Sequence, residues 1–111
     1  MRYTFDEFQK MSWRRCTEAF PPQCQEIRFL ALAMAGEVGE LCNIVKKAER
    51  GDFSVMDKRD DIIKEIADVM TYCDLLMTRL SADTGIELYK KFFEVSRRVK
   101  WPKADYADSD I

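Results

Sequence analysis

The sequence contains no histidine, and this absence removes several classes of catalytic site. Without histidine the chain cannot build a Ser-His-Asp or Cys-His nucleophile system, an HExxH zinc site or a histidine general base. Any catalysis must therefore use carboxylates, lysines, tyrosines, thiols or a bound metal ion.

Glycine and proline are also scarce, with 4 Gly and 3 Pro among 111 residues. This scarcity favours helices over a turn-rich β fold. No apolar run approaches the roughly 18 residues that a membrane helix needs, and the N-terminal stretch MRYTFDEFQK is too polar for a signal peptide. A chain that is 47% hydrophobic and 34% charged is too apolar for disorder. We therefore expect a soluble, cytoplasmic, all-α domain.

Four cysteines are present without a CxxC pair: Cys16, Cys24, Cys42 and Cys73. Because the chain has no secretory signal, we expect these thiols to stay reduced instead of forming disulfides. Cys42 and Cys73 fall within apolar helical stretches, so we expect buried free thiols, with a metal or redox role as the alternative.

Helix start and stop signals divide the chain into four segments. A capping box at Thr4–Glu7 begins a first helix that runs to about Ala19, before two prolines. A long second helix is expected over residues 23–50, ending at Gly51. Ser54 or Asp57 then caps the next helix.

The third helix is expected over residues 57–83. Thr84–Glu87 has the spacing of another capping box, so Thr84 is expected to open a fourth helix that runs to about residue 99. We predict one domain over residues 1–102, a four-helix bundle with two long central helices, followed by a flexible acidic tail over residues 103–111.

Two glutamates on the second helix lie within or beside its apolar face, where a solvent-exposed glutamate is not expected. At about 100° per residue, Glu37 falls inside the apolar stripe that includes Leu30 and Leu41. Glu40 lies at the edge of that stripe, with Lys47 beside it.

The third helix repeats this arrangement, since Glu65 and Asp68 flank its apolar arc. On the same wheel Lys64, Asp74 and Thr78 face away from the core. Each long helix therefore presents two carboxylates at i, i+3 toward the interior.

Four carboxylates that face one another repel and resist desolvation. Lysines, bound protons or divalent cations could neutralise them; alternatively, each pair could be an ordinary solvated face or half of a surface ion pair. Oxygen ligands without His or Cys suit Mg²⁺ or Mn²⁺, and Mg²⁺ commonly leaves positions for phosphate oxygens.

The strings LAMAGEVGEL (32–41) and EIADVMTY (65–72) resemble the MazG-like all-α nucleoside triphosphate pyrophosphatases. That family carries an ExxE motif, a spacer and an ExxD motif, and here 24 residues (41–64) separate the two. The motif sequences are especially similar to those of single-domain MazG-like proteins and of the dCTP pyrophosphatase branch. The resemblance extends from Phe5 to Pro102.

The resemblance implies Mg²⁺-dependent hydrolysis of a (deoxy)nucleoside triphosphate to the monophosphate and pyrophosphate, in nucleotide-pool house-cleaning. It also implies a homodimer or homotetramer of helical bundles. By position, Glu37, Glu40, Glu65 and Asp68 would be the catalytic metal ligands. Which of them accepts a proton from water is left open.

Other residues are weaker candidates for binding the substrate. Lys47 and Lys91 could contact phosphate, although Lys47 could equally form a local salt bridge. Tyr72 matches a family tyrosine near the nucleotide, or packs in the core. Trp13 could stack on a base, although aromatic residues at helical spacing are more often core.

The last helix departs from the family pattern. Many relatives have Asn in wording like KFNEVS, whereas this chain has KFFEVS with Phe93 at that place. We therefore expect base or sugar recognition to differ.

Two rival functions remain open. The chain could be a non-catalytic acidic module that binds metal or a partner protein. The basic stretch 90–103 could also bind nucleic acid, but we interpret it as a solvated face that attracts a polyanionic triphosphate, so neither nucleic acid nor membrane is an expected partner.

Overall fold

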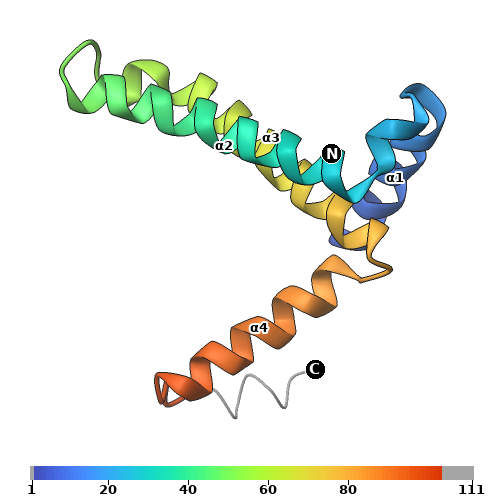
Figure 1. The fold of residues 1–111 in the computed structure, drawn as a ribbon. Coiled ribbons are helices and arrows are strands. Elements are labelled where there is room, and N and C mark those ends of the chain that lie inside the picture. The colour runs from blue at the N-terminus through green and yellow to red at the C-terminus, as the bar shows by residue number, and fades with distance from the viewer. Residues whose placement is uncertain (1, 104–111) are drawn as a thin grey trace.

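The computed structural model describes residues 2–103, and these form four α-helices, two short 3₁₀ helices and no strand (Figure 1). The all-α prediction is therefore confirmed. Of the predicted acidic tail, residues 104–111 lie outside the described residues.

Helix α1 spans Phe5–Ala19, as the capping signals predicted. The Thr4 hydroxyl accepts a hydrogen bond from the Glu7 backbone N–H at 3.1 Å and donates one to the Glu7 carboxylate at 3.1 Å. The helix ends at Phe20 because proline follows, and the short 3₁₀ helix η1 (Pro22–Gln25) makes the turn.

Helix α2 spans Ile27–Glu49 and begins four residues later than predicted, because η1 occupies the expected first turn. It ends as predicted before Gly51, whose φ of +94° is the left-handed conformation that favours glycine at this position. The prediction that Ser54 or Asp57 caps the next helix is wrong, because that helix begins at Arg59 and has no side-chain cap. Ser54 and Asp57 bond to each other instead: the Asp57 N–H donates to the Ser54 hydroxyl at 3.1 Å, and the Ser54 N–H donates to the Asp57 carboxylate at 3.3 Å.

After η2 (Met56–Lys58), helix α3 spans Arg59–Arg79 and ends four residues before the predicted boundary. Helix α4 spans Thr84–Arg98. The prediction that Thr84 caps α4 is wrong. Asp83 is the cap, because its carboxylate accepts the Ile86 N–H at 2.9 Å, whereas Thr84 is the first helical residue and its hydroxyl turns inward.

The long helices α2 and α3 pack against each other as a hairpin, and α1 crosses one end of it (Figure 1). The core lies at this crossing. Leu30 is fully buried there, beside Cys16 and Leu75, with Trp13 and Tyr72 packed against them.

The single chain does not form a closed four-helix bundle. Helix α4 contacts α1 and α3 where it begins and then projects away from the hairpin (Figure 1). The Cα radius of gyration is 17.1 Å, against about 13 Å for a compact domain of this length. The chain is therefore an open arrangement of helices, with a small core for its length.

The prediction of buried thiols holds for Cys16 but is wrong for Cys42 and Cys73, which are exposed; Cys24 is half-buried. All four are free, as expected. Both lie within apolar stretches of α2 and α3, and both stay exposed even though the Cys73 thiol contacts the Met34 sulfur of α2 at 3.3 Å. Many large apolar side chains are exposed as well, including Leu32, Met70 and Phe92 at 68%, 57% and 52%.

Within residues 2–103, no helix combines the length and apolar character that crossing a membrane requires.

Candidate metal centre

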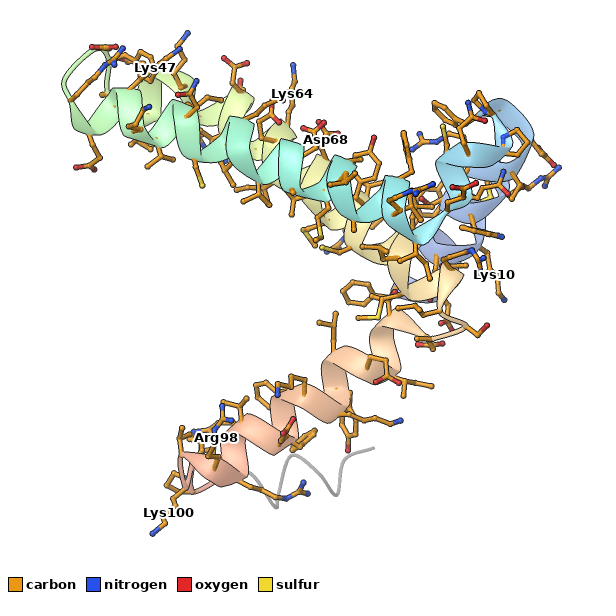
Figure 2. All side chains as sticks on the ribbon, in the orientation of Figure 1. Lys10, Lys47, Lys64, Asp68, Arg98 and Lys100 are labelled. Atoms are coloured by element: carbon orange, nitrogen blue, oxygen red, sulfur yellow. The ribbon has the colours of Figure 1, made fainter. Side chains whose placement is uncertain are left out.

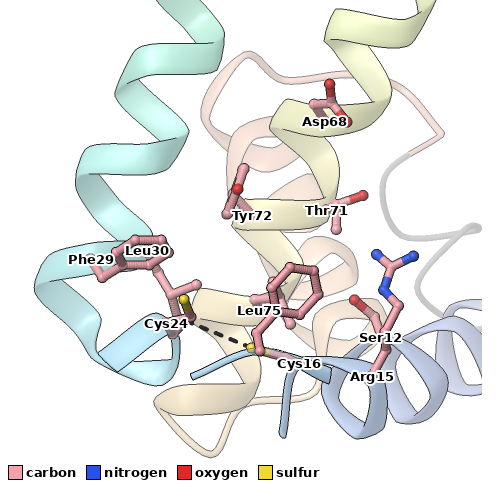
Figure 3. A pocket seen from close by; sticks show the side chains of 11 residues that line it. Ser12, Arg15, Cys16, Cys24, Phe29, Leu30, Asp68, Thr71, Tyr72 and Leu75 are labelled. Carbon is pink, nitrogen blue, oxygen red and sulfur yellow. Dashed lines mark hydrogen bonds between the residues drawn. The ribbon is translucent and has the colours of Figure 1, made fainter. Parts of the chain in front are cut away.

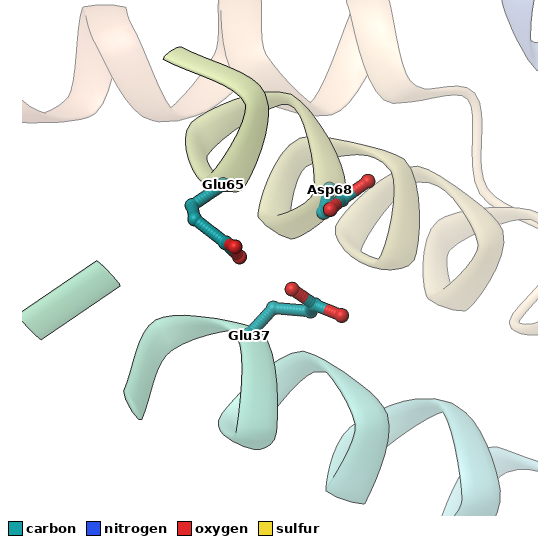
Figure 4. Close-up of side chains that lie close together, drawn as sticks. All are labelled: Glu37, Glu65 and Asp68. Carbon is teal, nitrogen blue, oxygen red and sulfur yellow. The ribbon is translucent and has the colours of Figure 1, made fainter. Parts of the chain in front are cut away.

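The α2–α3 hairpin brings three of the four predicted carboxylates together (Figure 4). Glu37 from α2 faces Glu65 and Asp68 from α3, and one oxygen from each lies within 4.8 Å of the others. The i, i+3 spacing places Glu65 and Asp68 one turn apart on α3, and the packing of α2 supplies the third group. We call Glu37, Glu65 and Asp68 the acidic cluster.

The acidic cluster lacks partners of opposite charge. Glu37 and Glu65 are half-buried, and the Oε2 atom of each is buried without a hydrogen-bond donor. None of the ion pairs found within residues 2–103 includes a cluster residue. Buried carboxylate oxygens without a donor are costly, so the cluster needs a proton or a cation.

The close approach of the carboxylates raises the pKa of Glu65 to about 7. The largest cause is the Glu37 carboxylate, with which a protonated Glu65 can share its hydrogen; burial and the charge of Glu40 add to it. A divalent cation would replace this shared proton. Because all donors are hard oxygens, the residues present fit Mg²⁺ or Mn²⁺.

Glu40, the fourth predicted ligand, is exposed and lies outside the group of three. It is nevertheless close enough to Glu65 to raise the pKa of that carboxyl. The structure therefore places Glu40 beside the cluster and not within it.

Tyr72 joins the acidic cluster to a neighbouring cavity. It lies one turn beyond Asp68 on α3, and its ring lines that cavity (Figure 3). Burial raises the pKa of the Tyr72 phenol, and the negative charges of Glu37 and Asp68 raise it further. The phenol is therefore a stable hydrogen-bond donor near the cluster at neutral pH.

Lys47, Lys91 and Trp13 are not gathered at the acidic cluster. Lys47 is half-buried toward the far end of the hairpin, with Lys64 between it and Asp68 in Figure 2. Lys91 lies on α4, which projects away from the hairpin, and pairs with Glu94 at 2.9 Å. Trp13 packs against the core and lines an outer groove with Gln9 and Thr78, apart from the cavity beside Tyr72.

Phe93 also lies on α4 and is buried, with 4% of its surface exposed. Its ring packs at 4.4 Å from that of Tyr89 and 5.2 Å from that of Phe92. Within one chain, this side chain therefore serves packing along α4.

The prediction that Asp74 and Thr78 face away from the core is wrong. They face away from α2, but α1 covers that side of α3: Gln9 of α1 donates to the Thr78 hydroxyl at 2.9 Å. Asp74 is 4% exposed and accepts a hydrogen bond from the Thr84 hydroxyl at 2.5 Å. Burial is the main cause that raises the pKa of Asp74, and nearby Asp83 adds to it.

Gln9 completes a polar junction where α1, α3 and α4 meet. Its amide donates to the Ala82 carbonyl at 2.8 Å as well as to Thr78, and its carbonyl accepts the Thr84 N–H at 3.1 Å. This junction is not predictable from the sequence, because it depends on the crossing of α1 and not on any local pattern.

Comparison with protein-family models, with curated proteins and with solved structures finds no match to this chain.

Proposed function

We propose that the chain is a nucleoside triphosphate pyrophosphohydrolase of the MazG-like type. It would hydrolyse a (deoxy)nucleoside triphosphate to the monophosphate and pyrophosphate with Mg²⁺, and so clear nucleotides from the cytoplasmic pool. The observation that carries this proposal is the acidic cluster: three carboxylates from two helices, next to a cavity and without an ion pair to any lysine or arginine in the part of the chain that the structure describes.

Glu37, Glu65 and Asp68 would hold the cation, with Glu40 beside them. When bound, Mg²⁺ neutralises charge on phosphate oxygens and makes water a better nucleophile at neutral pH. These carboxylates can accept the proton that water loses as the bond between the α-phosphorus and the bridging oxygen breaks. Tyr72 can donate a hydrogen bond to a phosphate oxygen at the edge of the cluster.

The sequence wording supports the same proposal. The ExxE and ExxD motifs that resemble the MazG-like family are the segments whose carboxylates meet in the hairpin. If the two motifs only stabilised their own helices, Glu37 of the first motif would have no reason to face Glu65 and Asp68 of the second.

We also propose that two or four copies of the chain associate. Among the described residues, helix α4 contacts other helices only near its beginning, and an open groove beside it is lined by Leu88, Phe92, Val99 and Trp101. Exposed apolar residues continue along the hairpin, for example Leu32 and Met70. Apolar surface on this scale marks an interface, and a second copy is the partner that every solution of the chain contains.

The direct test is to incubate the protein with a panel of canonical and modified nucleoside triphosphates and Mg²⁺, and to measure pyrophosphate and orthophosphate separately. We expect pyrophosphate from at least one substrate and none without divalent cation. No turnover on any substrate would support the rival, a non-catalytic acidic module that binds metal or a partner protein. Release of orthophosphate alone would overturn the proposed bond cleavage.

The nucleic-acid alternative draws on the basic end of α4. It predicts salt-sensitive DNA or RNA binding that falls when Arg97 and Arg98 are neutralised. The nucleotide proposal predicts no such binding.

A further inference from the structure

A cavity of about 180 Å³ lies between α1, η1 and the beginning of α2 on one side and α3 on the other (Figure 3). Its position is fixed by the crossing of α1 over the hairpin, beside Leu30 and Leu75 of the core. An apolar void could be a simple packing defect, but this cavity has a polar side as well as an apolar side.

The cavity opens toward the acidic cluster. Asp68 belongs to both, and Tyr72 lines the cavity while lying in the field of Glu37 and Asp68. A nucleotide whose phosphates meet the cluster would therefore extend its base into this space. The rings of Phe20, Phe29 and Tyr72 provide surfaces on which a planar base can stack.

Ser12 supplies the strongest sign that the cavity is built for a ligand. It is 5% exposed, it lines the cavity, and its buried hydroxyl has no hydrogen-bond partner. Buried hydroxyls are normally satisfied, so this one calls for a partner that the described chain does not provide.

Arg15 lies one turn beyond Ser12 on α1 and also lines the cavity. Within residues 2–103 its guanidinium makes no hydrogen bond or ion pair. Figure 3 shows four residues in order along one side of the cavity: Asp68, Thr71, Arg15 and Ser12. The phosphates would bind at the Asp68 end, so Arg15 lies farther into the cavity, past Thr71. Guanidinium only donates hydrogen bonds, so it can recognise only acceptors.

We propose that this cavity holds the base of the nucleotide, and that Ser12 and Arg15 select bases that carry a carbonyl oxygen at pyrimidine position 4 or purine position 6. Uracil, thymine and guanine would then be preferred over cytosine and adenine, which present an amino group at the corresponding position. This inference rests on the proposed function. It also departs from the cytosine preference implied by the resemblance to the dCTP pyrophosphatase branch.

The first test compares kcat/KM for dUTP and dCTP, whose rings have the same size. We expect a preference of about tenfold or more for dUTP in the wild type, typical of arginine reading a carbonyl edge. Arg15→Met should bring the ratio toward one. Arg14→Met is the matched control, because Arg14 is the preceding residue, pairs with Glu18 and lies outside the cavity.

An equal loss on both substrates in Arg15→Met would mean that Arg15 contacts phosphate or sugar, and would overturn the inference. A wild-type ratio near one, or a preference for dCTP, would overturn it as well. Ser12→Ala adds a second readout: removing an unsatisfied buried hydroxyl should leave the melting temperature unchanged or higher while lowering the preference for dUTP. A lower melting temperature with an unchanged preference would assign Ser12 a structural role.

A binding experiment separates this inference from the hydrolysis proposal. We expect dUMP without Mg²⁺ to shift the backbone amide signals of Ser12, Cys16 and Thr71 in a ¹H–¹⁵N NMR titration, and dCMP to do so more weakly. Signals from the far end of α2, such as Lys46, serve as the reference. Selective shifts without turnover of any triphosphate would retain the base site and refute the hydrolysis, whereas turnover without these shifts would retain the hydrolysis and refute the base site.

Discussion

At the scale of single residues, the central feature is a group of carboxylates that face one another and that form no ion pair within residues 2–103. Glu65 shows the consequence most clearly, since the contact with Glu37 raises its pKa to about 7. The repulsion between these carboxylates destabilises the folded chain between α2 and α3. A cation bound there would remove the repulsion, because all the carboxylates could coordinate it.

This arrangement predicts how stability depends on pH. Glu65 has an ordinary pKa of 4.5 and a folded-state pKa of about 7. Its contribution to stability is therefore fully present below pH 4.5 and is lost as the pH rises through about 7. Without divalent cations the melting temperature, followed by circular dichroism, should fall over this window. Mg²⁺ should raise it more at pH 8 than at pH 5.5.

Glu65→Gln provides the control for this prediction. In this variant the melting temperature should depend less on pH, because the titrating Glu65 carboxyl is gone. Mg²⁺ should also raise the melting temperature much less than in wild type. Asp74, whose pKa is also raised, shifts stability in the same direction and accounts for a remaining slope. Equal stabilisation by Mg²⁺ in Glu65→Gln and wild type would remove Glu65 from the cation site.

Individual residues also show how far the sequence determines the site. A fixed rotation of about 100° per residue places Glu37, Glu65 and Asp68 on the facing sides of two helices, so their meeting was predictable from the string alone. The burial of Asp74 was not predictable, because a helical wheel identifies only the side of the helix that carries the apolar stripe. Helix α3 has two covered sides, one against α2 and one against α1, and only the tertiary structure reveals the second.

At the scale of elements, the junction around Gln9 determines how α4 leaves the hairpin. One side chain bonds α1 to Thr78 of α3, to the Ala82 carbonyl in the corner and to the first N–H of α4. The Asp74–Thr84 hydrogen bond closes the same corner. Among the described elements, α4 contacts only α1 and α3 to any extent, so we expect this junction to control its attachment.

Gln9→Ala should therefore destabilise the protein by about 1–3 kcal/mol, because it leaves the Ala82 carbonyl and the Thr84 N–H without their partners. Urea denaturation measures this change. Hydrogen exchange at Thr84 and Ile86 should accelerate more than exchange in the middle of α2.

Lys10→Ala is the matched control on the same helix, since Lys10 is exposed and a surface substitution of this kind changes stability by only about 0.5 kcal/mol or less. If Gln9→Ala were as stable as Lys10→Ala, the junction would not hold α4.

The helices themselves were largely predictable, because capping and stop signals are local. Thr4 and Gly51 act at the expected places. The prediction failed where neighbouring signals competed. Asp83 and Thr84 are both good capping residues, and Thr84 is drawn into the helix because its hydroxyl bonds to Asp74 across the corner. The local sequence does not predict that hydrogen bond.

At the scale of the whole molecule, the chain is extended for its length and leaves much of its apolar surface uncovered. Helical periodicity predicted which faces are apolar, but not what covers them. Cys42 and Cys73 are exposed for this reason. Association between copies would cover these faces and complete a core that one chain leaves small.

Phe92→Ala tests this account of the surface. Phe92 is 52% exposed and lines the groove along α4 with Trp101, whose ring centroid lies 5.8 Å from its own. If α4 lies in an interface, the substitution should weaken association by about tenfold or more, as loss of a buried aromatic anchor does. Sedimentation velocity over a range of concentrations measures the effect.

Glu94→Ala serves as the control, since Glu94 is exposed on the same helix and makes a surface ion pair with Lys91 of small energetic value. A wild-type protein that is monomeric at all concentrations would contradict the proposed association. So would equal association constants for Phe92→Ala and wild type.

The measurement that tests the central claim most directly is a ³¹P NMR time course of triphosphate hydrolysis with Mg²⁺ by wild type, Glu37→Gln and Glu49→Gln. Glu37 lies in the acidic cluster, whereas Glu49 is an exposed glutamate at the end of the same helix. We predict that wild type and Glu49→Gln release monophosphate and pyrophosphate at similar rates, and that Glu37→Gln is slower by about 100-fold or more. Equal rates in Glu37→Gln and Glu49→Gln, or no pyrophosphate from wild type, would contradict the account.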